Sequence, residues 1–187
     1  MTDSGSATTD VVDELTTDHR EIKTLLARIP RARDPQVRRD LADRVITEVV
    51  RHAVAEEMYV YPAMSRHLPN GEQEAEHDAQ EHKEIERTLK ELEAVDAEDP
   101  RFLRLIDQLD RQLDHHIEEE ERHQFPELRA RIPRQELVEL REKVDAAKKI
   151  APTRPHPDAP NTELFHKLVG PGVGLIDRIR DKLTGRG

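Results

Sequence analysis

The sequence predicts an all-α protein, an antiparallel up-down four-helix bundle with extra C-terminal helices. Apolar residues recur at alternating steps of three and four along four segments of roughly 20 to 30 residues, which is the period of an amphipathic helix. Short turns that contain Pro, Gly or Asp separate these segments, as an up-down bundle requires. Charged residues make up 37% of the 187 residues and apolar residues 35%, a balance that suits helices with a narrow apolar stripe.

The first two helices are predicted at 10–29 and from Pro35 to the neighbourhood of Pro62. Along the first runs a stripe that includes one histidine: Val12, Leu15, His19, Ile22, Leu26 and Ile29. Asp34-Pro35 is an N-cap followed by Pro at the first helical position, and it starts the second helix. One face of that helix carries Leu41, Val45, Val49, His52, Glu56 and Tyr59. We expect Pro62 to kink or end the helix.

The third and fourth helices repeat this arrangement after a turn at 68–71. The third, predicted over 72–95, carries His82, Ile85, Leu89 and Leu92 on one stripe. Asp99-Pro100 repeats the cap and starts the fourth helix, which presents Phe102, Leu105, Leu109, Leu113, His116, Glu120 and His123. The two halves of the chain therefore match in their apolar stripes as well as in their histidines.

The remaining segments are separated by changes in composition. Small polar residues over 1–9 indicate a disordered lead-in, and 10–150 are predicted to form the bundle with a trailing helix that begins at Pro133. Residues 151–187 are predicted to be a Pro-rich linker followed by a short amphipathic helix. This tail holds six Lys or Arg and four Asp or Glu, so its net charge is +2. The sequence does not identify a protein partner for the tail.

Charge and composition exclude several classes of function. A net charge of -10 argues against nucleic acid as the main partner, because phosphate binding needs a basic surface. The chain has no Cys, which excludes disulfides and iron-sulfur clusters. No apolar run approaches the roughly 20 residues of a membrane span, and residues 1–10 lack the features of a signal peptide. We therefore expect a cytoplasmic protein that is not an integral membrane protein.

One pattern of metal-type ligands occurs twice along the chain. In the first half, His19 is followed by His52-x-x-x-Glu56 and then by Tyr61-Pro62. In the second half, His82 is followed by His116-x-x-x-Glu120 and then by Phe125-Pro126. Two equivalent sets of ligands in a helical chain predict a site for two metal ions.

Helix geometry supports this interpretation. Residues four apart on a helix are separated by about 40° and 6 Å, so the His and the Glu of each pair can reach one ion. Because the pairs continue the apolar stripes, all four helices direct ligands toward the bundle axis. Imidazole with carboxylate suits iron, manganese or zinc. Six ligands shared by two ions leave coordination positions open, as in a reactive rather than a structural site.

The alternative is that these histidines are ordinary hydrogen-bonded core residues. A single histidine on an apolar stripe is more often such a residue than a ligand. The repeat favours metal, because six residues recur in the same order on the inner faces of two halves. Burial of Glu56 and Glu120 among aliphatic side chains without a cation also costs several kcal/mol.

The order His19, His52-x-x-x-Glu56, His82, His116-x-x-x-Glu120 resembles the hemerythrin-like HHE cation-binding domain over about residues 10 to 130. The resemblance implies a four-helix bundle with two non-heme iron ions, bridged by oxygen and carboxylate. It further implies a small ligand, such as oxygen, nitric oxide or peroxide, and a role in oxidative or nitrosative stress handling. The implied metal ligands are His19, His52, Glu56, His82, His116 and Glu120.

Two departures separate the chain from oxygen-carrying hemerythrin. That family has His-x-x-x-His on the third helix, where this chain has His77-x-x-x-x-His82, and its last motif ends in Asp five residues after His, where this chain uses Glu120. Both departures count against reversible oxygen carriage. Ferritin-like di-iron proteins are a weaker match, because Glu120-x-x-His123 has their spacing but Glu56 to Tyr59 does not.

Several residues near the motif have no settled role. In an undistorted helix His77 lies about 140° from His82, which directs it elsewhere. Tyr59 and His123 are each seven residues past a ligand histidine, so they are expected to cap the core, with a hydrogen bond to the site or ligation of metal as the alternatives. Glu57 and its counterpart Glu121 are expected on a solvated face, with a bridging carboxylate as the alternative. The unequal pairs, Tyr59 with His123 and His77 with Glu14, mark where the halves differ.

Three functions fit these observations. The protein is a di-iron enzyme that decomposes peroxide or handles nitric oxide, an iron or oxygen sensor or carrier without turnover, or a helical interaction protein with a vestigial site. The repeated ligand set favours the first two. No separate nucleophile or acid-base pair stands out, so no catalytic residue is predicted and enzymatic activity is left open.

Overall fold

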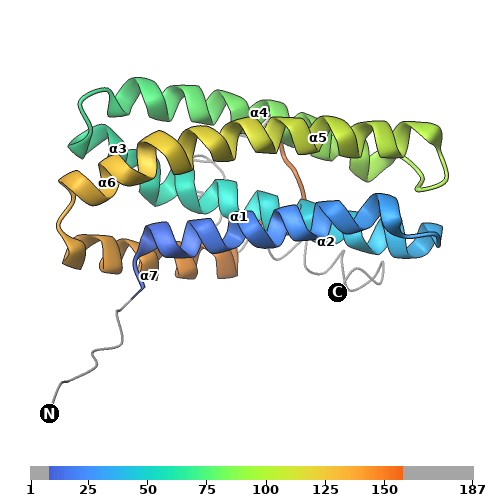
Figure 1. Cartoon of the computed structure of the whole chain (residues 1–187), viewed down its shortest axis with the longest axis horizontal. Coiled ribbons are helices and arrows are strands. Elements are labelled where there is room, and N and C mark those ends of the chain that lie inside the picture. Colours follow the sequence, from blue (N-terminus) through green and yellow to red (C-terminus); the bar gives the residue numbers. More distant parts are fainter. Residues whose placement is uncertain (1–8, 158–187) are drawn as a thin grey trace, which may run out of the picture.

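The computed structural model describes residues 9–157, and within them the chain forms helices without a strand. Four long helical rods pack side by side, as Figure 1 shows. The first rod is α1 (Val11–Arg28), and the third is α4 (Gly71–Ala94). The second and fourth rods each contain a π turn between two α-helices: α2 (Pro35–Ala55), η2 (Glu56–Val60) and α3 (Tyr61–His67), then α5 (Pro100–Glu119), η3 (Glu120–Gln124) and α6 (Phe125–Arg131). This arrangement confirms the predicted four-helix bundle.

Aspartates cap three of the rods at their N-termini. Asp10 and Asp13 form a capping box at the start of α1. Asp34 accepts a hydrogen bond of 2.8 Å from the backbone N–H of Gln36, and Asp99 accepts one of 2.8 Å from that of Arg101. The cap-and-Pro starts predicted for the second and fourth helices are thus present.

The rods do not end at Pro62 and Pro126, so of the two outcomes expected for Pro62, a kink or an end, the end is wrong. Instead, each helix widens into a π turn just before its proline. Tyr61 donates its backbone N–H to the carbonyl of Glu56, five residues back, and Phe125 donates in the same way to Glu120. A proline ring clashes with the carbonyl four residues earlier in an α-helix, and a wider turn relieves that clash. The helix can therefore continue as α3 or α6.

The hydrophobic core consists of two clusters along the bundle. One cluster lies toward the α1–α2 and α4–α5 loops and is built around Leu26, Ile46, Leu89, Phe102 and Leu109. The other lies toward α3, α6 and α7 and is built around Leu15, Met64, Leu128, Leu137 and Val144. A layer of buried polar side chains separates the two clusters and holds the candidate site.

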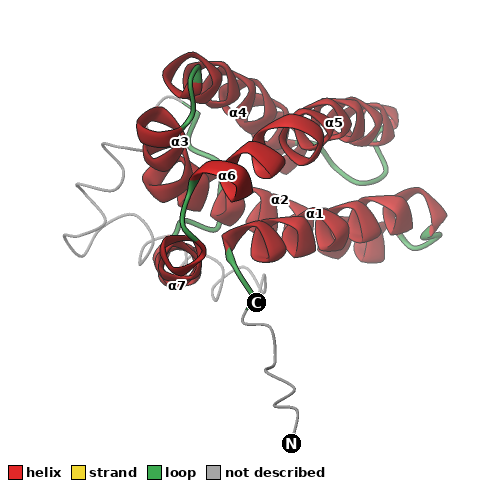
Figure 2. Ribbon diagram, turned by 60° about the vertical axis from the view of Figure 1, so that its left-hand side comes forward, coloured by secondary structure: helices red, strands yellow, loops and turns green. Residues whose placement is uncertain are grey.

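The trailing helix α7 (Arg134–Ile150) packs beside α1 and α2, as the view in Figure 2 shows. Residues 151–157 then follow in non-helical conformation with Ala151, Thr153 and Arg154 buried. Arg154 pairs with Glu93 of α4 at 2.5 Å, which ties this segment to the third rod. Residues 1–8 of the predicted lead-in and the predicted tail helix within 158–187 lie outside the described residues. No helix in the described part combines the length and the apolar character of a membrane span.

Candidate metal centre

The six predicted ligands meet in one buried layer of the bundle. Each rod contributes one histidine, and Glu56 and Glu120 are the first residues of the two π turns. All six side chains are at most 5% exposed: His19, His52, Glu56, His82, His116 and Glu120. The structure therefore brings together all the residues that the repeat singled out.

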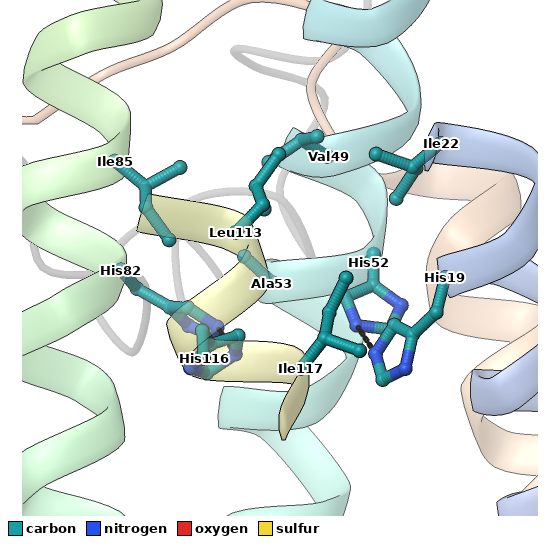
Figure 3. Close-up of a pocket in the computed structure, with 10 residues that line it drawn as sticks. All are labelled: His19, Ile22, Val49, His52, Ala53, His82, Ile85, Leu113, His116 and Ile117. Atoms are coloured by element: carbon teal, nitrogen blue, oxygen red, sulfur yellow. Dashed lines mark hydrogen bonds between the residues drawn. The ribbon is translucent and has the colours of Figure 1, made fainter. Parts of the chain in front are cut away.

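The four histidines form two facing pairs, visible in Figure 3. The Nε2 atoms of His19 and His52 are 3.1 Å apart, and those of His82 and His116 are 3.0 Å apart. Ligands of one ion with metal–ligand bonds of about 2.1 Å are separated by about 3.0 to 3.4 Å. Each pair of nitrogens thus has the spacing of two ligands on one ion.

The two glutamates lie between the histidine pairs. Oε2 of Glu56 is 3.2 Å from Nε2 of His52 and 3.5 Å from Nε2 of His82. Glu120 spans the pairs with both oxygens, because Oε2 is 3.2 Å from Nε2 of His19 and Oε1 is 3.6 Å from Nε2 of His116. Each carboxylate therefore reaches both halves of the site, which is the arrangement of a bridging ligand.

Every histidine of the layer has a carboxylate on its other ring nitrogen. The contacts from Nδ1 are His19 to Glu121 at 2.9 Å, His52 to Asp18 at 3.1 Å, His82 to Glu57 at 3.0 Å, and His116 to Glu81 at 2.8 Å. An ionised carboxylate only accepts, so each Nδ1 donates its N–H. In a neutral imidazole the Nε2 atom then carries a lone pair, and this lone pair points into the centre.

This chemistry fits metal cations. Two Nε2 atoms that face each other at 3.1 or 3.0 Å repel when both are unprotonated, unless a cation lies beside them. Both oxygens of Glu56 and Oε2 of Glu120 are buried and accept no hydrogen bond. Buried carboxylates without such partners are costly unless they coordinate metal. The donor set of four imidazoles and two carboxylates therefore suits two cations held in adjacent positions.

The carboxylates also alter the acidity of the histidines. Burial lowers the pKa of His52, but Glu56 and Asp18 outweigh that effect and raise the pKa to about 10 in the metal-free protein. Burial likewise opposes protonation of His82, yet Glu56 and Glu57 raise its pKa well above the usual value. Protons therefore compete with metal for these nitrogens, and metal binding releases protons.

The aromatic residues of the two motifs flank the centre. Tyr61 stacks on His82 with ring centroids 5.4 Å apart, and Phe125 stacks on His19 at 5.7 Å. The hydroxyl of Tyr61 is 3.1 Å from Nε2 of His82, the nitrogen that faces the centre. Burial, followed by the nearby Glu56 and Glu120, raises the pKa of Tyr61 well above 10. A protonated phenol thus lies beside one half of the site and a benzene ring beside the other.

A further buried acid borders the second half of the site. Asp78 of α4 is completely buried, and one of its oxygens accepts a hydrogen bond of 3.1 Å from Gln124. Burial, and then repulsion from Glu120, raises the pKa of Asp78 to about 7. Asp78 therefore titrates near neutral pH in the metal-free protein.

A small cavity adjoins the four histidines (Figure 3). Its volume is about 10 Å³, which is room for about one water-sized molecule. The four histidines line it together with the apolar side chains of Ile22, Val49, Ala53, Ile85, Leu113 and Ile117. Only a very small ligand fits such a space without rearrangement.

Three of the residues with unsettled roles, His77, His123 and Tyr59, lie away from this layer. His77 is 57% exposed and lies beside Glu81 and Glu119 on the surface. His123 is exposed, and Tyr59 is half-buried against the core cluster near α3. The break in symmetry that reaches the centre is instead Tyr61 opposite Phe125.

The sequence did not reveal the four carboxylates that pair with the inner histidines. Asp18 and Glu81 immediately precede His19 and His82, and this repeated acid-His pair was a usable signal. Glu57 and Glu121 were expected on a solvated face. Glu121 is exposed, as expected, whereas the Glu57 side chain is only 14% exposed, and each accepts a hydrogen bond from a histidine of the layer.

Comparisons with known proteins point the same way. A family model described as the hemerythrin HHE cation binding domain matches residues 10–128. An uncharacterized hemerythrin-like protein of Schizosaccharomyces pombe is 31% identical over 176 residues, which cover 94% of this chain and 87% of that protein. A DNA nickase of a Nostoc species is 24% identical over 139 residues, or 74% of this chain and 39% of the nickase.

A solved structure has the same fold. It is the crystal structure of a hemerythrin HHE cation binding domain-containing protein from Mycobacterium kansasii. It superimposes with a TM-score of 0.65 over 87% of this chain and 93% of that one, at 24% identity.

Proposed function

Because the chain belongs to the hemerythrin HHE cation-binding family, we propose that its layer of His and Glu holds two iron ions and binds a small ligand such as dioxygen, nitric oxide or peroxide. The observation that carries this proposal is the pair of facing histidines on each side of Glu56 and Glu120, next to a cavity of about 10 Å³. We place this activity in oxidative or nitrosative stress handling in the cytoplasm.

Two ions are supported by how the ligands divide. His19 and His52 form one group with Glu56 and Glu120, while His82 and His116 form another with Glu56. Four imidazoles around a single ion would leave little room for the carboxylates. Two neighbouring ions, with Glu56 and Glu120 as bridges, use every inward-facing atom and leave positions open for a ligand.

Iron suits the donor set and the proposed ligands. Imidazole and carboxylate are both ligands of non-heme iron. Iron, when bound, supplies open coordination positions and a change of oxidation state. The side chains supply the rest: the carboxylates on Nδ1 fix the orientation of each imidazole, and Tyr61 keeps a proton beside His82. The apolar side chains of the cavity restrict the site to small molecules and exclude bulk water.

Metal analysis of the purified protein is the first test. We expect two irons per chain and the visible absorption of a ferric pair joined by an oxide bridge. The Glu56→Gln/Glu120→Gln variant should lose both, because amides neither bridge nor balance the charge. Glu118→Gln, on the surface of the same rod, should keep two irons. Zinc alone, or no metal, in the wild-type protein would refute the proposal.

Ligand experiments on the iron-loaded protein distinguish an enzyme from a sensor or carrier. Hydrogen peroxide or nitric oxide added in excess should be consumed over many turnovers, and His52→Ala should abolish that consumption. Stoichiometric binding without consumption would instead assign a sensor or carrier role. If none of these ligands changes the optical spectrum, the proposed ligand class is wrong.

A further inference from the structure

A second group of His and Glu lies on the surface of the bundle, across α4 and α5. His77 and Glu81 are four residues apart on α4, and His115 and Glu119 are four residues apart on α5. This is the His-x-x-x-Glu spacing of the buried centre, used here on the outer faces. Because the two rods are antiparallel neighbours, each histidine lies beside the glutamate of the other rod as well as its own.

The four side chains are close enough to share one ion. Nε2 of His77 is 3.3 Å from Oε2 of Glu119 and 3.6 Å from Oε1 of Glu81. Nε2 of His115 is 3.4 Å from Oε1 of Glu81 and 3.9 Å from Oε1 of Glu119. One ligand atom from each residue lies within 4.8 Å of all the others. In a tetrahedral zinc site with bonds of about 2.0 to 2.1 Å, the ligands are about 3.3 Å apart. Only small side-chain movements are therefore needed to close around an ion.

Burial and hydrogen bonding position one of these ligands in advance. The side chain of Glu81 is 16% exposed, and its Oε2 accepts a hydrogen bond of 2.8 Å from Nδ1 of His116. Its Oε1 faces His77 and His115 instead. The two histidines are 57% and 63% exposed, so an ion can reach them from solvent. Two isolated surface ion pairs would not require each histidine to contact both glutamates. They would also not require the Glu81 carboxylate to be held in place by His116.

We propose that His77, Glu81, His115 and Glu119 form a surface site for a divalent transition-metal ion of the zinc class. Two imidazoles and two carboxylates suit Zn²⁺, which has no geometric preference of its own. The site is separate from the buried centre, but Glu81 belongs to both. The Glu81 carboxylate would then lie between the zinc ion and His116.

Zinc counting tests the site directly. The full-length protein, with whatever metal it holds after purification, is dialysed against ZnCl₂, and bound zinc is measured. We expect wild type to bind one zinc per chain more than His77→Ala/His115→Ala. The control His67→Ala/His123→Ala removes two other imidazoles and should bind as much zinc as wild type. Equal zinc contents in wild type and His77→Ala/His115→Ala would overturn the proposal.

Chemical modification gives a second measurement on the wild-type chain. Diethylpyrocarbonate acylates accessible imidazoles, and peptide mass spectrometry locates each product. Added ZnCl₂ should slow the modification of His77 and His115 several-fold and leave that of the exposed His123 unchanged. Equal rates with and without zinc at all three residues would refute the site.

Iron content separates this proposal from the one for the buried centre. Because His77 and His115 lie outside the buried layer, the His77→Ala/His115→Ala variant should retain the same buried metal as wild type. Loss of that metal together with the surface zinc would show that the two histidines serve the buried centre, and the separate site would be wrong. Failure to find iron in wild type leaves the zinc count unaffected.

Discussion

At the scale of single residues, each inner histidine is held by a carboxylate as well as by its helix. Asp18, Glu57, Glu81 and Glu121 accept from the four Nδ1 atoms and so direct the four Nε2 atoms inward. Such partners fix the tautomer of a metal-binding imidazole and raise its basicity. These acids therefore contribute to the centre through the ligands that they orient.

Replacement of Glu121 tests this role. Glu121→Gln should weaken metal binding by roughly 10- to 100-fold, because the amide is a poorer acceptor for Nδ1 of His19. Glu118→Gln, one turn earlier and paired with Arg122, should leave the affinity unchanged. Competition with a chelator measures both. Equal affinities for the two variants would restore the interpretation of Glu121 as a solvated surface residue.

Tyr61 is a residue at which the two halves of the centre differ. Its counterpart Phe125 has the same stacked position but no hydroxyl. The Tyr61→Phe variant makes these two aromatic positions alike. We expect it to retain two metal ions per chain but to have an altered optical spectrum. Its affinity for a small ligand should fall by roughly five- to tenfold, the value of one hydrogen bond.

Tyr59→Phe is the matched control, because Tyr59 is the other tyrosine of the chain and lies outside the buried layer. It should match wild type in spectrum and ligand affinity. If Tyr61→Phe also matches wild type, the hydroxyl has no part in the centre.

At the scale of helices, the π turns decide which residues face the centre. A π turn holds one more residue than an α turn, so later residues move back around the axis by up to about 100°. An ideal α-helix would place position 59 on the inner face, near His52. With the π turn, position 59 leaves that face and position 61 enters it. The prolines that cause the wider turns therefore help to bring Tyr61 and Phe125 to the site.

The trailing helix α7 also acts on the centre. Lys148 pairs with Asp18 at 2.5 Å and with Glu14 at 2.9 Å, and Asp18 in turn holds His52. Burial raises the pKa of Asp18, but His52 and Lys148 outweigh it and lower the pKa below 3.8. A carboxyl with a lowered pKa in the folded state stabilises that state above its unfolded pKa, and this contribution is lost as pH falls through the folded pKa.

Lys148→Met should therefore make the centre more sensitive to acid. Without the ammonium group, the pKa of Asp18 rises, so protonation of Asp18 and release of His52 begin at a higher pH. We expect the midpoint of metal loss in a pH titration to move up by a few tenths of a unit to about one unit. Lys143→Met, an exposed change on the same helix, should leave the midpoint in place. No difference between the two variants would show that α7 does not influence the site.

At the scale of the whole molecule, the centre joins all four rods between two hydrophobic clusters. The six inner ligands come from segments that span residues 19 to 120 of the chain. In the absence of metal, the buried carboxylates oppose folding unless protonated histidines neutralise them. Metal that binds only the folded bundle shifts the folding equilibrium by mass action.

Metal removal should consequently destabilise the protein. With free metal at about a hundred times its Kd, the bound form gains about 2.7 kcal/mol, which corresponds to a rise in Tm of several degrees. Calorimetry of the metal-free and metal-loaded protein measures the difference. The Tm of Glu56→Gln/Glu120→Gln should not respond to iron. A wild-type Tm that is independent of metal would contradict the proposed centre.

The sequence by itself determined the fold class, the helix starts and the residues that converge on the centre. Each of these follows from a pattern within a single helix: an apolar stripe, an N-terminal cap, or a His and a Glu four residues apart. His19, His52, Glu56, His82, His116 and Glu120 all follow from that local periodicity. The internal repeat then placed them in matching order in both halves.

Only the tertiary structure decided the surroundings of those ligands. The contact of His19 with Glu121 joins residues 102 positions apart and depends on the relative rotation of two rods. The surface group of His77, Glu81, His115 and Glu119 requires two antiparallel helices in one register. The inward position of Tyr61 depends on a π turn. A sequence pattern read with the 100° step of an α-helix does not include such a turn. The periodicity of the sequence specifies which residues share one face of a helix, whereas helix packing specifies which residues that face contacts.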